Sequence, residues 1–424
     1  MKATPGSAAG TASGATAGTA AGTVLGARGW RTPLVILFAG AMVVNMTMGV
    51  RHGMGLFMNP MTTELGLSRE AYSFAIALQN LAWGLFTPIL GGVADRYGAA
   101  RVMVVSLVVY ALGLWGMSIA SDSLTLTLSA GVAIGLAQGG ATVGIITGVV
   151  GRAYPPEQRS QALAVSGALG AFGQFYMMPL LQGLIDQASW HTALLVSAAL
   201  MLLVIPLSLA MTEPYIDRST LKKGGLKEAF NEAIRDRSFL LLSMGYFVCG
   251  FQVVFIGVHL PTYLRDIGLS ANVGSRALAI IAIGNIVGTY LWGMQGARYP
   301  KRLLLSTIYF LRAAVIVLFM LAPKTELTVY IFAGAMGSLW LSTVPLTNGL
   351  VAARYGVAYL SMLSGVVFFG HQIGSFTGVW MGGYLFDKTG TYFWAWVTAA
   401  ALGVFAGLIH LPINEKPILR PVVA

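Results

Sequence analysis

Residues 72–121 read YSFAIALQNLAWGLFTPILGGVADRYGAARVMVVSLVVYALGLWGMSIAS. Two apolar runs, near 72–94 and 102–121, flank a short turn that carries Asp95, Arg96 and Arg101. Each run has the roughly 20 residues that a helix needs to cross about 30 Å of hydrocarbon. The stretch therefore predicts two membrane-spanning helices joined by a tight polar loop.

The same alternation of long apolar runs and short polar breaks continues along most of the chain. Hydrophobic residues make up 56% and charged residues 10% of the 424 positions, whereas soluble domains carry about 25% charged residues. Strands of a membrane barrel would alternate in short segments instead. We expect an all-α membrane protein with 12 transmembrane helices, near 33–58, 72–94, 102–121, 124–150, 160–185, 190–211, 238–263, 276–296, 303–322, 327–351, 358–386 and 391–411.

The placement of basic residues predicts the orientation. Of the 26 Lys and Arg residues, 19 fall in tails and loops on one side, five on the other side and two within spans. The positive-inside rule places the basic side in the cytoplasm. We expect both termini to be cytoplasmic in a bacterial-type inner (plasma) membrane. Since this topology accounts for the net charge of +11, nucleic-acid binding is not expected.

A polar stretch divides the spans into two groups of six. We expect a disordered cytoplasmic tail over 1–30, because it is Gly, Ala, Thr and Ser with almost no large apolar side chain. Six-helix bundles are expected over 31–211 and 238–412, with a cytoplasmic tail over 413–424. The linker over 212–237 has helical i,i+4 charge spacing, which predicts an interfacial helix.

The two halves resemble each other at an offset of about 201 residues. The matching pairs are Arg96-Tyr97 with Arg298-Tyr299, Tyr154 with Tyr355, and Asp186 with Asp387. Internal repeats of this kind are typical of secondary transporters. The repeat predicts two pseudo-symmetric bundles with a solute site between them.

The segment Gly91–Arg101 resembles the loop between helices 2 and 3 of the major facilitator superfamily. The resemblance covers residues 30 to 412 and implies that family's fold, with a latch between the bundles formed by Asp95, Arg96 and Arg101, and by Arg298 in the second half. The segments Gly49–Phe57 and Leu65–Ser68 are similar to the bacterial oxalate/formate antiporter and monocarboxylate porter branch. That likeness implies secondary active transport by alternating access, and we expect a functional monomer.

Charged side chains inside spans are costly, about 2.5 kcal/mol or more at mid-bilayer, and are therefore candidates for function. No Asp or Glu lies at the middle of a predicted span, but Arg51 and Arg312 lie within spans. An anionic substrate is therefore favoured, since a guanidinium binds both oxygens of a carboxylate. We expect Arg51 to bind it, with extension to the headgroups as the alternative; Arg312 is expected to pack against a neighbour or backbone carbonyls.

Three histidines within spans, His52, His259 and His371, are the candidates for proton coupling, because histidine titrates near pH 6.5. His371 lies in Phe369–Gln372, which mirrors Phe172–Gln174 in the first half. Further candidates for substrate binding are Gln79, Asn80, Gln138, Gln174, Asn285 and Asn348. Most are expected to be interhelical hydrogen bonds.

One departure from the branch concerns residues 283–288. Carboxylate porters of that branch usually carry an arginine in helix 8, whereas this stretch reads IGNIVG. Either Arg51 or His371 then binds the anion, or the substrate is not a simple carboxylate.

The leading hypothesis is a carrier for a small organic anion, in particular a monocarboxylate, with proton coupling left open. Its alternatives are a proton-driven multidrug or other small-solute exporter of the same fold and a non-transporting membrane sensor. No phosphate-binding loop and no metal-spaced His or Cys cluster occurs in the sequence. We therefore expect neither an enzyme nor a cofactor.

Overall fold

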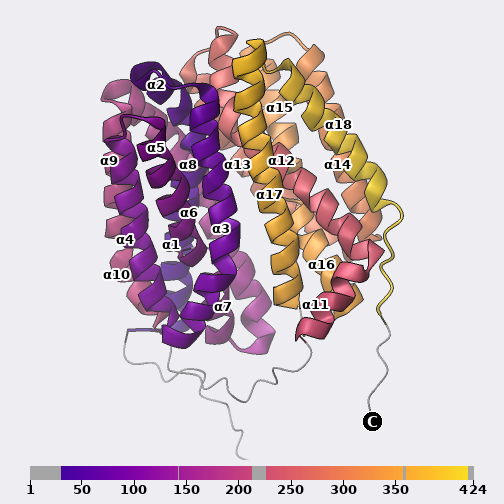
Figure 1. The fold of residues 1–424 in the computed structure, drawn as a ribbon. Coiled ribbons are helices and arrows are strands. Elements are labelled where there is room, and N and C mark those ends of the chain that lie inside the picture. The colour runs from indigo at the N-terminus through magenta and orange to yellow at the C-terminus, as the bar shows by residue number, and fades with distance from the viewer. Residues whose placement is uncertain (1–29, 142, 213–225, 357–359, 419–424) are drawn as a thin grey trace, which may run out of the picture.

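The computed structural model describes residues 30–141, 143–212, 226–356 and 360–418. Within these ranges the chain is helical and contains no strand. Figure 1 shows two groups of helices side by side, the first coloured indigo to magenta and the second rose to yellow. The predicted tails and much of the predicted linker, residues 1–29, 213–225 and 419–424, lie outside the described residues.

The first half contains α1 (Pro33–His52), α2 (Met54–Leu65), α3 (Arg69–Tyr97), α4 (Ala99–Ser118), α5 (Ser123–Leu126), a π-helical stretch η1 (Thr127–Ala133), α6 (Ile134–Gly140), α7 (Val143–Ala153), α8 (Pro156–Gln187), α9 (Trp190–Leu203), α10 (Ile205–Ser208) and a 3-10 turn η2 (Leu209–Met211). The second half contains α11 (Leu226–Arg235), α12 (Arg237–Asp266), α13 (Ala271–Gln295), α14 (Lys301–Leu321), α15 (Glu326–Leu339), α16 (Thr343–Tyr355), α17 (Leu360–Thr389) and α18 (Phe393–His410). The helix α11 lies where a linker helix was expected.

Eleven helical segments in the described residues are long and apolar enough to cross a membrane. The twelfth predicted span is α17, which is 30 residues long. It carries the polar run His371-Gln372, and it packs against α3 and α12 inside the molecule. A helix buried among other helices does not need the apolarity of one that faces lipid. The all-α fold with two bundles is thus confirmed.

Several predicted spans are not single straight helices, and two of their breaks matter for the site. The span predicted over 33–58 ends as α1 at His52, turns at Gly53 and continues as α2 to Leu65. The span predicted over 327–351 breaks between Leu339 and Thr343. The second break could not be predicted from hydropathy, because the apolar run continues through it.

Glycine contacts show the repeat in three dimensions. Gly173 of α8 lies against the backbone of Asn45 on α1, and Gly374 of α17 lies against the backbone of Phe247 on α12, each without room for a Cβ atom. The two glycines are 201 residues apart, so α1–α8 and α12–α17 are equivalent helix pairs. The same offset matches Gln174 with Ser375. The expectation that Gln174 mirrors the His371 region was therefore wrong by one helical turn.

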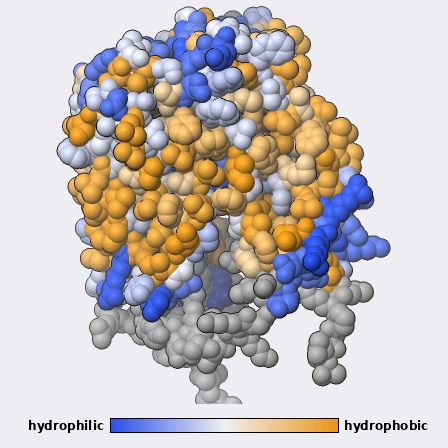
Figure 2. Space-filling model, in the orientation of Figure 1, coloured by the Kyte–Doolittle hydropathy of each residue, from blue (hydrophilic) through white to orange (hydrophobic). Residues whose placement is uncertain are grey.

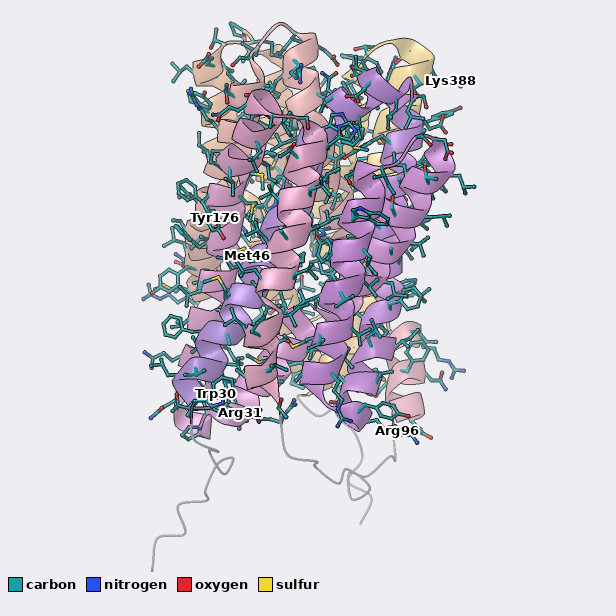
Figure 3. All side chains as sticks on the ribbon, turned by 90° about the vertical axis from the view of Figure 1, so that its left-hand side faces the viewer. Trp30, Arg31, Met46, Arg96, Tyr176 and Lys388 are labelled. Carbon is teal, nitrogen blue, oxygen red and sulfur yellow. The ribbon has the colours of Figure 1, made fainter. Side chains whose placement is uncertain are left out.

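The halves meet along a seam where α3 packs against α17 and α8 packs against α13. Trp30, Arg31 and Arg96 mark one end of the molecule in Figure 3, and Lys388 marks the other. We call the end with Trp30 and Arg96 the linker face and the end with Lys388 the far face. In Figure 2 an apolar band lies between more polar ends, and the surface between the halves is hollowed toward the linker face.

Candidate functional site

Arg51, in the last turn of α1, points at α3. Its Nη2 donates a hydrogen bond to Asn80 Oδ1, and its guanidinium carbon lies 4.5 Å from the centroid of the Trp83 ring. Asn80 and Trp83 are three residues apart and therefore share a face of α3. Arg51 Nε is buried without a hydrogen-bond partner. Among the described residues no carboxylate lies within 4.0 Å of Arg51, so this cation has no counter-ion.

Aromatic contacts lead from Arg51 across the seam to His371. Trp83 meets the Phe368 ring edge-on, with centroids 5.2 Å apart. Phe368 in turn lies parallel to the His371 ring at 5.9 Å, and Tyr246 of α12 lies 4.9 Å from the same imidazole. Four helices, α1, α3, α17 and α12, thus bring the cation of one half close to the imidazole of the other.

Hydrogen bonds follow the same path. Gln372 Nε2 donates to the backbone carbonyl of Asn80 at 3.0 Å, which ties α17 to α3 across the seam. His371 Nδ1 lies 3.0 Å from Gln372 Oε1 and 3.4 Å from Ser375 Oγ. We call Arg51, Asn80, Trp83, Phe368, His371 and Gln372 together the seam cluster. The structure brings together three residues predicted for the site, namely Arg51, Asn80 and His371.

Sequence reasoning did not select Trp83, Phe368 or Gln372. A signal was available for Trp83, since it lies one helical turn after Asn80 and arginine stacks readily on tryptophan. Phe368 and Gln372 carried no such signal, because their roles depend on the contact between α3 and α17.

Arg312, the second arginine within a span, is fully buried and held by backbone carbonyls. Its Nε donates to the Leu339 carbonyl at 3.1 Å and its Nη2 at 2.6 Å, and Nη2 also donates to the Trp340 carbonyl. Its Nη1 lies 3.4 Å from Gln252 Oε1. These carbonyls belong to the break between α15 and α16, where the helix leaves acceptors unpaired. The expectation that Arg312 packs against carbonyls agrees with this geometry.

Asn285 of α13 binds a backbone N–H group in the same break between α15 and α16. Its Oδ1 accepts a hydrogen bond from the Leu341 backbone N–H at 3.1 Å and from Thr289 Oγ1 at 3.2 Å. In the described structure this residue, predicted for substrate binding, stabilises an irregular backbone segment.

The other predicted amides, Gln79, Gln138, Gln174 and Asn348, make none of the contacts described for the seam cluster. Gln79 Nε2 donates to the Ala130 carbonyl at 2.9 Å, and Gln138 Nε2 lies 3.4 Å from the Tyr110 hydroxyl while its Oε1 is buried without a partner. Gln174 is buried on α8, whereas Asn348 is exposed on α16. The bonds of Gln79 and Gln138 are of the interhelical kind.

Two of the three histidines are bonded to backbone carbonyls. His52 Nδ1 lies 2.8 Å from the Met48 carbonyl, one turn earlier on α1. His259 is buried and has both ring nitrogens engaged, with Nε2 2.8 Å from the Val379 carbonyl and Nδ1 3.1 Å from the Tyr392 hydroxyl. A proton at Nε2 and an acceptor at Nδ1 satisfy this geometry with a neutral ring. His371 is the one of the three that lies in the seam cluster.

The far face is held closed by bonds between the two halves. Arg69 of α3 forms a two-fold ion pair with Asp266 of α12, at 2.5 and 2.7 Å. Asp387 accepts hydrogen bonds from the backbone N–H groups of Arg69 and Glu70 at 3.3 and 2.7 Å. Its carboxylate thus caps the positive N-terminus of α3 from the opposite half. We call Arg69, Asp266 and Asp387 the far-face clasp.

The predicted latch lies at the other end of the seam. Asp95, Arg96, Arg101 and Arg298 are all exposed at the linker face. An ion pair within the second half lies at the same face, between Asp236 and Arg354 at 2.5 Å, with the Tyr355 hydroxyl also donating to Asp236. Burial alone would raise the pKa of Asp236, but the hydrogen bonds from Arg354 and Tyr355 outweigh it and hold the pKa below its ordinary value.

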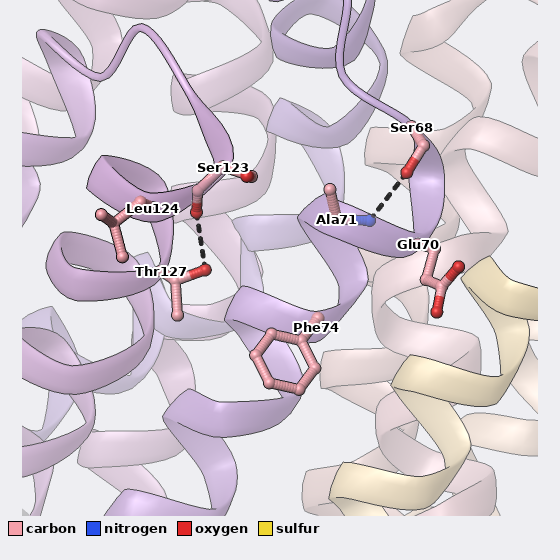
Figure 4. Close-up of a pocket in the computed structure, with 7 residues that line it drawn as sticks. All are labelled: Ser68, Glu70, Ala71, Phe74, Ser123, Leu124 and Thr127. Atoms are coloured by element: carbon pink, nitrogen blue, oxygen red, sulfur yellow. Dashed lines mark hydrogen bonds between the residues drawn. The ribbon is translucent and has the colours of Figure 1, made fainter.

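A surface pocket near the far face is separate from the seam cluster. It is lined by Ser68, Glu70, Ala71, Phe74, Ser123, Leu124 and Thr127, as Figure 4 shows. Its hydroxyls are engaged locally, since Ser68 Oγ accepts from the Ala71 N–H at 3.0 Å and Thr127 Oγ1 donates to the Ser123 carbonyl at 2.7 Å. No group of three or more metal-ligating side chains occurs in the part of the chain that the structure describes.

A family model described as the Major Facilitator Superfamily matches residues 37–282 and 242–422. The chain belongs to the major facilitator superfamily. Among relatives of known description, monocarboxylate transporter 13 of Bos taurus is 27% identical over 429 residues, covering 93% of each chain. The hexuronate transporter of Bacillus subtilis (strain 168) is 24% identical over 383 residues, covering 84% of this chain and 87% of the relative.

Membership in the superfamily agrees with the fold. The crystal structure of the nucleoside transporter NupG superposes with a TM-score of 0.70 over 90% of this chain and 98% of that chain, at 13% identity. The protein is therefore a multi-pass membrane transporter for a small solute, consistent with the expectation that it is not an enzyme.

Proposed function

We propose that this superfamily member is a secondary active transporter for a small organic anion, a monocarboxylate, with Arg51 as the anion-binding group. The observation that supports this is Arg51 itself: a guanidinium inside a span, stacked on Trp83, with no carboxylate within 4.0 Å in the described structure and an unpartnered Nε. A carboxylate would supply both the missing charge and the missing acceptor. The relatives include a monocarboxylate transporter and a hexuronate transporter, and the substrates in these names are organic acids. The names therefore also support a negatively charged substrate.

Alternating access explains why the two ends of the seam differ, one closed and the other hollowed. The far-face clasp joins the halves at one end, while the surface is hollowed toward the linker face. With the linker face in the cytoplasm, as the basic residues predict, this conformation opens inward. In the outward conformation the clasp separates, and Asp95, Arg96, Arg101 and Arg298 latch the linker face.

The domain boundaries follow the same proposal. The bundles over 31–211 and 238–412 move as units around the linker 212–237, and α11 lies at the membrane surface. One chain carries both halves of the site, so the monomer is the functional unit.

His371 is the proposed proton carrier. It lies in the seam cluster, and protonation there would add a second positive charge near the bound carboxylate. Proton binding and anion binding would then favour each other, which is the coupling that symport requires.

Reconstituted liposomes test the proposal. Uptake of radiolabelled lactate, pyruvate, formate and oxalate is measured with and without an inward proton gradient, for the parent chain and for Arg51→Gln. We expect Arg51→Gln to abolish uptake, while Arg276→Gln, an exposed arginine on α13, retains it. Full activity of Arg51→Gln would remove Arg51 from the site, and no uptake of any anion would refute the substrate class.

The same preparation separates coupling from binding. We expect His371→Gln to lose accumulation driven by the proton gradient and to keep exchange of labelled for unlabelled anion. If proton-driven accumulation persists in His371→Gln, another group carries the proton.

A further inference from the structure

The seam cluster offers a substrate one permanent positive charge, that of Arg51, and several ring faces. Arg312 cannot supply a second charge, because its guanidinium is fully buried and engaged by the Leu339 and Trp340 carbonyls and by Gln252. A single guanidinium matches an anion with one carboxylate. A dianion would bring a second charge that no second guanidinium meets, and a charge without a partner is costly in a low-dielectric site.

The polar groups beside Arg51 are already engaged with each other. Asn80 Nδ2 donates to the Ile76 carbonyl at 2.8 Å, and Asn80 Oδ1 accepts from Arg51. Gln372 Nε2 donates to the Asn80 carbonyl, and Gln372 Oε1 faces His371. A substrate rich in hydroxyl groups would therefore find few partners here, and buried hydroxyls without partners weaken binding.

Ring faces make up much of the rest of the cluster. Trp83 and Phe368 contact each other edge-on across the seam, and Phe368 continues to His371 and Tyr246. Because Trp83 comes from α3 and Phe368 from α17, a planar ligand packed against this pair of rings would contact both halves of the transporter. Aromatic pairs favour such offset or edge-on contacts.

Open space adjoins Phe368. Gly365 lies one turn earlier on α17, and a Cβ atom placed on it would meet no atom within 4 Å. Residues three apart share a helix face. The open space at the exposed Gly365 therefore lies on the same face of α17 as Phe368.

We propose, on the basis of the proposed function, that the substrate is an aryl monocarboxylate: one carboxylate bound by Arg51 and a planar apolar body packed against the contacting rings of Trp83 and Phe368. The carboxylate pairs with the part of the guanidinium that Asn80 does not engage, since Asn80 accepts the hydrogen bond from Nη2. Trp83 and Phe368 then determine specificity, and Arg51 determines the charge.

Binding to the purified full-length protein in detergent tests this proposal, because aryl acids cross lipid in their neutral form and would blur uptake. Isothermal titration at pH 7 compares phenylacetate with acetate, glucuronate and phthalate. We expect phenylacetate to bind at least tenfold more tightly than each of the others. Arg51→Gln should abolish binding of all four anions.

Two variants address the ring site. We expect Phe368→Leu to reduce the preference for phenylacetate over acetate at least fivefold, whereas Phe405→Leu, the same change at an exposed position on α18, leaves it unchanged. Gly365→Leu fills the space beside Phe368 and should weaken phenylacetate binding while acetate binding stays. Leucine is a better helix former than glycine, so Gly365→Leu is expected to fold.

The outcomes separate this proposal from the proposed function. If anions bind through Arg51 but phenylacetate has no advantage, or if glucuronate binds best, the aryl specificity is wrong and the anion transporter stands. If Phe368→Leu and Gly365→Leu leave the preference intact, the ring site is wrong. If none of the anions binds, or Arg51→Gln binds them normally, the proposed function fails as well.

Discussion

Arg51 and Arg312 are both arginines within membrane spans, yet their surroundings differ. Arg312 donates to carbonyls freed by the break between α15 and α16 and is fully buried. Arg51 has one hydrogen bond to Asn80, a ring face at Trp83 and an unpartnered Nε. A buried guanidinium is thus structural where broken backbone supplies acceptors, and it remains available to a ligand where backbone does not.

The largest expected effect is on the stability of the Arg312 site. We expect Arg312→Met to lower the unfolding temperature strongly, because the Leu339 and Trp340 carbonyls lose their donor at about 1–3 kcal/mol each, only partly offset by removing a buried charge. Arg51→Met should change stability by about 1 kcal/mol or less, since it removes one hydrogen bond. Thermal unfolding of both variants in the same detergent measures this difference. Equal decreases in unfolding temperature would show that the two arginines do not differ in structural role.

Replacing Arg51 with lysine tests whether charge or geometry makes Arg51 differ from Arg312 in function. We expect Arg51→Lys to reduce anion uptake by about tenfold, or about 1.4 kcal/mol, because lysine keeps the charge and loses the two-pronged geometry. Its unfolding temperature should match that of the parent chain. Uptake at the parent level in Arg51→Lys would mean that charge alone suffices at this position.

A third arginine has the counter-ion that Arg51 lacks. Arg69 pairs with Asp266 across the seam, and a partly exposed ion pair is worth up to about 1 kcal/mol, or about fivefold in a conformational population. We expect Arg69→Gln to open the far face more often. Met58 is buried, and its sulfur lies 3.9 Å from the Tyr392 hydroxyl. A cysteine placed there by Met58→Cys, in a chain whose own cysteine is removed by Cys249→Ala, would become accessible to a reagent when the far face opens.

Maleimide labelling of that cysteine measures the opening. We expect labelling a few-fold faster with Arg69→Gln and unchanged with Lys388→Gln, a basic residue at the same face. Equal labelling rates in all three would show that the clasp does not hold the far face closed.

The smallest effect is expected at the linker face, where Arg354 has a carboxylate partner in its own half. The pKa of Asp236 is held below its ordinary value, so its ion pair stabilises the fold above the ordinary Asp pKa of about 3.9 and is lost as pH falls through the lowered value. Asp236→Asn should lower the unfolding temperature slightly at pH 7. The difference from the parent chain should shrink toward pH 3; a constant difference would rule out the ionised carboxylate as its cause.

Several features followed from the sequence alone. The lengths of the apolar runs predict the spans, since the bilayer sets the length of a crossing helix, and the 201-residue repeat predicts two bundles. The absence of mid-span acids singled out Arg51 and Arg312. These features depend on composition and spacing along the chain, which a sequence contains in full.

Only the tertiary structure decided what each polar residue contacts. Asn285 and His259 were predicted as site residues because polar groups inside spans are rare. In the fold Asn285 accepts a hydrogen bond from the Leu341 N–H in the helix break. His259 is engaged by the Val379 carbonyl and the Tyr392 hydroxyl. The sequence likewise could not show that Phe368 meets Trp83, 285 positions away, because that contact arises where α17 packs on α3. A sequence states which groups must find partners in lipid; the packing of helices determines which of them do and which remain for a ligand.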